Sequence, residues 1–83
     1  MRTRAKVVGM GARKSGIGKK TGRPYDFTTL HLVYPDKNTE GFAVAPADVD
    51  QSILDPIPLP KINDEIDIVY HLENFKMVVD AII

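Results

Sequence analysis

Apolar and polar residues alternate in short runs along this chain, and turn residues separate the runs at close spacing. Alternation with a period of two is typical of β-strands, because successive side chains point to opposite faces. The clearest run is residues 25–34, which the turn residues 35–38 follow. One face of this predicted strand carries Tyr25, Phe27, Thr29, His31 and Val33, and the other carries Asp26, Thr28, Leu30, Leu32 and Tyr34. Both faces hold apolar groups, as in a barrel strand with a ligand-covered outside or in an ordinary core strand.

Four further runs complete a set of five predicted strands: residues 5–12, 40–45, 65–71 and 75–83. Residues 46–54 have room for a single helical turn. Residues 55–60 contain three prolines and are expected to be an extended connection, because proline neither donates to a ladder nor continues a helix. Residues 13–24 are too rich in glycine and charge for regular structure, which predicts a long, mobile loop. The fold class is therefore all-β, a five-stranded OB-like barrel with a long basic hairpin loop.

The length of 83 residues corresponds to one domain, residues 1–83, with a modest core. A chain this short gains buried area by association, so we expect a homodimer. It has no cysteine, which excludes disulfides, thiol nucleophiles and cysteine-bound zinc. Its first residues lack the apolar stretch of a signal peptide, and no run is long enough to cross a bilayer. We expect a cytoplasmic protein that does not contact membranes.

Charge is distributed unevenly, although the net charge is zero. Residues 1–25 contain eight lysines and arginines and no acid, whereas residues 26–83 contain three lysines and eleven acids. Such asymmetry indicates contact with nucleic acid or an anionic membrane, because local potential steers a polyanion. A basic hairpin that only aids solubility is the alternative.

No catalytic or cofactor motif is present. Gly18-Lys19 resembles the end of a phosphate-binding P-loop, but Arg13 occupies the place of its first glycine and Lys20 the place of its hydroxyl residue. His31 and His71 lie on different predicted strands without a further metal ligand. The expectation is a protein that is not an enzyme and uses no metal or cofactor.

Cations followed by aromatic rings remain as the candidate chemistry. Lysine and arginine bind phosphates, and exposed rings stack on unpaired bases without demanding a particular sequence. The candidate nucleic-acid-binding residues are Arg13, Lys14, Lys19, Lys20, Arg23, Tyr25, Phe27 and Tyr34. Core packing is the alternative role for the rings.

Gly22-Arg23-Pro24-Tyr25, between a basic loop and an aromatic strand, resembles the filamentous-phage helix-destabilising proteins and their relatives on phages and conjugative elements. The resemblance covers residues 5–36 best and returns in residues 65–83. It implies a small OB-fold homodimer that coats single-stranded DNA during DNA replication with little sequence preference. It implies phosphate binding by the loop cations, stacking by Tyr25, and DNA contact by Tyr34. The chain departs from the family in lacking cations near its C-terminus.

Two other functions fit the same residues. An RNA-binding OB-type module would use the same groove and rings. A protein-interaction module of a phage or mobile element would use the acidic remainder of the chain to contact a basic partner.

Overall fold

The computed structural model describes all residues from 1 to 83 and contains six β-strands and one short helix. In chain order the elements are β1 (Arg2–Met10), β2 (Lys14–Ile17), β3 (Pro24–Pro35), β4 (Phe42–Asp50), α1 (Gln51–Leu54), β5 (Glu65–Glu73) and β6 (Lys76–Ile82). The helix is a single turn and is far too short to span a membrane.

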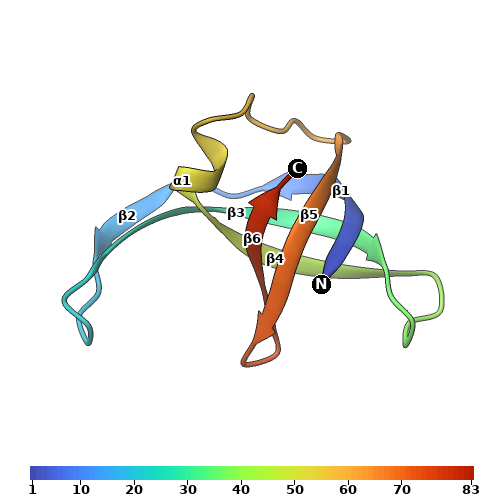
Figure 1. Ribbon diagram of the computed structural model, residues 1–83, viewed down its shortest axis with the longest axis horizontal. Helices are drawn as coiled ribbons and strands as arrows, with labels where there is room; N and C mark the ends of the chain where they lie inside the picture. The colour runs from blue at the N-terminus through green and yellow to red at the C-terminus, as the bar shows by residue number, and fades with distance from the viewer.

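Five of the strands close into a barrel (Figure 1). β1 pairs antiparallel with both β3 and β5, β3 pairs antiparallel with β4, and β5 pairs antiparallel with β6. A short parallel pairing between β4 and β6 completes the ring. Three antiparallel strands, a helix, two more strands and a parallel closing pair make an OB-like barrel. The predicted fold class is confirmed.

The interior of the barrel is filled by apolar side chains from alternate positions of the five barrel strands. On β3, Leu30 and Leu32 are fully buried while His31 between them is exposed. The faces predicted for residues 25–34 are thus the faces observed. The buried core cluster is Ala5, Val7, Leu30, Leu32, Ala47, Val49, Leu54, Ile68, Met77 and Val79.

One end of the barrel is covered by α1 and the proline-rich connection after it. Asp50 caps the helix, because its carboxylate accepts hydrogen bonds from the backbone N and the Oγ of Ser52 at 2.9 and 2.7 Å. This cap directs Leu54 into the core, where it is 2% exposed. Ile53 and Ile57 pack against the same cluster. The segment that follows has no regular structure, as its prolines predicted.

β4 is longer than the sequence pattern indicates. The pattern predicts a strand over 40–45 and a helical turn within 46–54, but the strand continues through Pro46 to Asp50 and the helix begins only at Gln51. Every residue of β4, from Phe42 to Asp50, pairs with β3, whereas β6 pairs only with residues 47–49 of β4. The other edge of β4 has no ladder partner at Pro46, and proline is tolerated at such an edge.

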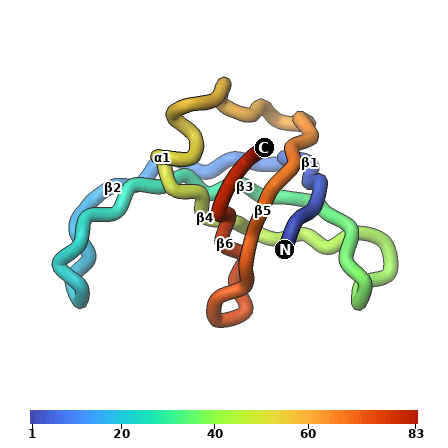
Figure 2. The backbone as a smooth tube through the Cα atoms, viewed as in Figure 1, coloured from blue at the N-terminus to red at the C-terminus, as the bar shows by residue number.

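The prediction that residues 13–24 lack regular structure is wrong in part. β2 forms within this segment and pairs antiparallel with the start of β3, from Pro24 to Phe27. The resulting ribbon projects beyond the barrel at one end of the long axis (Figure 2). All four β2 residues are exposed, so cross-strand pairing holds β2 in place without burial in the core. The hairpin is therefore an arm with its own ladder.

Candidate nucleic-acid interface

The tip of the β2–β3 arm presents its cations on a hydrogen-bonded turn. The Gly18 N–H donates to the Arg23 carbonyl at 2.8 Å, and the Gly22 N–H donates to the Gly18 carbonyl at 2.9 Å. Gly22 has φ +66°, a conformation that glycine adopts without strain. Lys19 and Lys20 lie within this closed turn and are exposed. The structure thus brings Lys19, Lys20 and Arg23 together at one end of the molecule.

Tyr25 and Phe27 lie next to each other on the outward face where the arm joins the barrel. Their ring centroids are 5.8 Å apart and their planes are tilted by 42°. Tyr25 is 44% exposed and Phe27 is half-buried. Neither ring belongs to the core cluster. Two adjacent, accessible rings outside the core provide a surface on which unpaired bases can stack.

β2 supports this surface from the other side of the ladder. Lys14 pairs with Phe27 and Gly16 pairs with Tyr25, so each pair shares a face. A Cβ added at Gly16 would lie 2.8 Å from the Tyr25 hydroxyl oxygen and 3.0 Å from its Cζ, so a side chain here would displace the ring from its place across the strand. This role of Gly16 cannot be predicted from the sequence, because it depends on the register of β2 against β3.

Arg13 is engaged elsewhere. Its Nε donates to Oδ1 of Asp26 at 2.8 Å, and its Nη2 pairs with Oδ2 of the same carboxylate. The hydrogen bond from Arg13 lowers the pKa of Asp26 below its ordinary value. Asp26 lies on the face of β3 opposite to Tyr25 and Phe27, so this two-pronged pair separates Arg13 from the rings. The structure therefore does not place Arg13 on the face that carries Lys14, Tyr25 and Phe27.

Acids limit the positive surface on the side of the barrel. Asp50 of β4 pairs with Phe27, and Asp48 pairs with Thr29. The Thr29 hydroxyl donates to Asp48 Oδ1 at 2.8 Å, which keeps that carboxylate on the outward face. Phosphates are repelled from this stretch of β4 and attracted toward the arm. The charge distribution therefore defines which end of the outward face suits a polyanion.

Tyr34 lies apart from the other predicted site residues. It is on the inward face of β3, near the far end of the strand, where it packs against the core and against Tyr70 with ring centroids 6.2 Å apart. Burial raises the pKa of Tyr34 above its ordinary value. Because side chains alternate between the two faces of β3, Tyr34 lies on the face opposite to Tyr25 and does not extend the stacking surface of the arm.

His71 has two carboxylate neighbours: Asp80 on the adjacent strand β6, which the sequence spacing did not reveal, and Glu73 two residues along β5. Its Nδ1 lies 2.9 Å from both carboxylate oxygens of Asp80, and its Nε2 lies 3.4 Å from Glu73. Asp80 chiefly, and Glu73 to a smaller extent, raise the pKa of His71 above its ordinary value. The cluster is exposed on the β5–β6 hairpin and away from the arm.

The raised pKa predicts that stability depends on pH. The carboxylates lie beside protonated His71 only in the folded chain. Their stabilisation of the fold is therefore complete below the ordinary His71 pKa of about 6.5 and is lost as pH rises through the raised pKa. Asp80→Asn should return the His71 pKa toward the ordinary value and flatten the fall in melting temperature across that window. NMR titration of the imidazole measures the pKa. An identical His71 titration in wild type and Asp80→Asn would contradict the prediction.

Comparison with known proteins gave no match: no protein-family model matches the chain, and no curated protein or solved structure is significantly similar to it. The strand pairing and the surface chemistry therefore define the class of protein: a small OB-like barrel with an arm that carries cations and aromatic rings.

Proposed function

We propose that this protein binds single-stranded DNA with little sequence preference. The observation that carries the proposal is the placement of Lys14, Tyr25 and Phe27 on one face of a ribbon whose tip holds further cations. Lysines on this ribbon would neutralise phosphates, and the rings would stack on bases that a duplex keeps paired. A preference for single strands follows, because only unpaired bases offer their faces to the rings.

The resemblance to the filamentous-phage helix-destabilising proteins supports the same proposal. In that family the loop between the first two barrel strands binds the DNA backbone, and a tyrosine after proline stacks on bases. The corresponding residues here are the arm cations and Tyr25, which belong to the same β2–β3 hairpin. We extend the proposal to a homodimer that keeps DNA unpaired in a phage or mobile element. Arg13 and Tyr34 contribute least, given their positions on the opposite face.

The direct test is titration of the protein into a labelled single-stranded DNA oligonucleotide at low and moderate salt, read by fluorescence anisotropy. Duplex DNA and RNA of the same sequence are the controls. We expect binding to the single strand that weakens with salt and is much weaker for the duplex. Tighter binding to RNA would identify the RNA-binding module instead, and no binding at low salt would overturn the proposal.

Tyr25→Ala should weaken binding to the single strand by about 1–3 kcal/mol, as loss of one stacking contact does. The dependence on salt should stay unchanged, because no phosphate contact is removed. Tyr25→Phe is the matched control, since it keeps the ring and should bind nearly as well as wild type. If Tyr25→Ala binds normally but unfolds at a lower denaturant concentration, the ring serves packing.

A further inference from the structure

The turn between β5 and β6 holds a phenylalanine in a conformation that suits glycine. Asn74 and Phe75 both have positive φ, +52° and +65°. Two successive positive φ values define the tight hairpin turn in which Asn-Gly is preferred, and a bulky residue at such a position is an outlier. The Phe75 side chain is fully exposed, at 102%. The chain thus keeps a large ring at a strained position where it covers nothing within its own fold, and strain of this kind points to a binding role.

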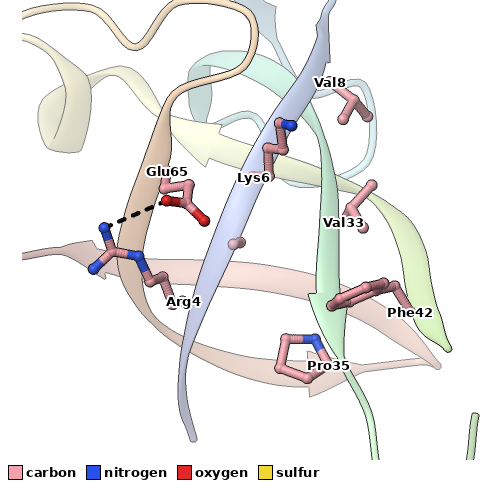
Figure 3. Close-up of a pocket in the computed structure, with 8 residues that line it drawn as sticks. Arg4, Lys6, Val8, Val33, Pro35, Phe42 and Glu65 are labelled. Atoms are coloured by element: carbon pink, nitrogen blue, oxygen red, sulfur yellow. Dashed lines mark ion pairs between the residues drawn. The ribbon is translucent and has the colours of Figure 1, made fainter.

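A groove of about 590 Å³ lies on another face of the molecule (Figure 3). Its apolar surface comes from Val8, Val33, Pro35 and Phe42, and Lys6 lies on its rim. Phe42 is 66% exposed and Val8 is 41% exposed, so much of this surface faces solvent. The volume falls within the range of about 300–1,000 Å³ found for ligand pockets, which is ample for one phenyl ring. The groove lies at the end of β3 away from Tyr25.

The charges around Phe75 and around the groove are complementary. Glu73 and Asp48 line a shallow hollow beside the turn, together with a single cation, Lys76. Two acids against one cation leave this surrounding with a net negative charge, which favours a protein surface over nucleic acid as the partner of the Phe75 ring. At the groove, Arg4 is paired with Glu65 at 3.7 Å (Figure 3), whereas Lys6 has no ion pair within 4.0 Å. Lys6 is complementary in charge to the acids beside the turn, of which Glu73 also lies 3.4 Å from His71 Nε2.

We propose that Phe75 of one molecule inserts into the groove of a second copy of this chain, with Glu73 facing Lys6. The inserted ring and the groove that receives it are different surfaces of the same molecule, so a single contact leaves one free ring and one free groove on the pair. The interaction involves neither the arm nor the Tyr25–Phe27 surface. It therefore stands independently of the proposed DNA binding, and it is tested without DNA.

Phe75→Gly is the first variant to measure. It removes the ring and places glycine where φ is positive, so the melting temperature should rise, by about 4–8 °C if the relief is worth roughly 1 kcal/mol. A lost association then cannot be attributed to misfolding. In analytical ultracentrifugation without DNA, the wild type should exceed its chain mass of 9.2 kDa with rising concentration, and Phe75→Gly should remain at 9.2 kDa. A monomeric wild type, or a variant that associates equally well, would overturn the proposal.

A mixing experiment separates this contact from other modes of association. Phe42→Ala keeps the Phe75 ring but removes a wall of the groove, so it should also be monomeric alone. An equimolar mixture of Phe42→Ala and Phe75→Gly combines one intact ring with one intact groove and should form a one-to-one dimer. A mixture that stays monomeric would contradict insertion of the ring into the groove, and association of either variant alone would mean that like surfaces pair. Unchanged association of Phe75→Gly with weakened binding to single-stranded DNA would assign the ring to nucleic acid instead.

Discussion

Replacing Lys19, Lys20 and Arg23 together with alanine should lower the affinity for single-stranded DNA about 10²–10³-fold at roughly 50 mM salt. Each phosphate contact on a single strand contributes about 0.7 to the slope of log affinity against log salt concentration, so three lost contacts should flatten the slope by about 2. All three side chains are exposed at the arm tip, so the barrel should unfold at an unchanged denaturant concentration. Titrations at four or more salt concentrations measure the slope.

The chain provides a charge-matched control for this experiment. Lys37, Lys61 and Lys76 are the lysines outside the basic N-terminal segment, and their replacement by alanine changes the net charge by the same amount. This control should retain nearly the wild-type affinity and slope. Equal loss in both triple variants would mean that total charge, rather than the arm, governs binding.

Leu30→Ala should destabilise the barrel by about 2–5 kcal/mol, the range observed when a buried leucine is truncated in a well-packed core. Leu30 is fully buried at the centre of β3, between the ladders to β1 and β4. A domain of this size is stable by roughly 4–12 kcal/mol, so the loss is a large part of the total. Urea denaturation followed by circular dichroism measures the change.

Leu59→Ala is the matched control, because Leu59 is 54% exposed in the proline-rich connection. It should change stability by less than about 0.5 kcal/mol. If the two leucine variants unfold at the same urea concentration, Leu30 does not contribute to the barrel core as its burial indicates.

The sequence predicted the barrel well because alternation and turn residues act locally. Residues 25–34 were assigned to a strand with the correct inward and outward faces, since each face follows directly from a period of two. The end of β4 was missed because a proline normally stops a strand. Pro46 is accommodated only because β6 reaches no further than Ala47, and this is a property of the whole barrel.

The candidate site was predicted in part for the same reason. Lys19, Lys20, Arg23, Tyr25 and Phe27 are close in sequence, so their proximity required only a hairpin. Other features depend on cross-strand register, which no local pattern gives. The pairing of Arg13 with Asp26, the glycine beneath Tyr25 and the carboxylate beside His71 all arise in this way.

The parallel β4–β6 pair that closes the barrel also sets the order of events when the chain is made. β4 and β6 are separated by α1, the proline-rich connection and β5, so their contact is non-local and cannot form until β6, the last strand in chain order, has been made. A nascent chain that has emerged only as far as β5 exposes the edge of β4 that later pairs with β6, and its core is incomplete. Until Met77–Val79 leave the ribosome, that edge is open to pairing with another chain, and synthesis of β6 is the step that protects it.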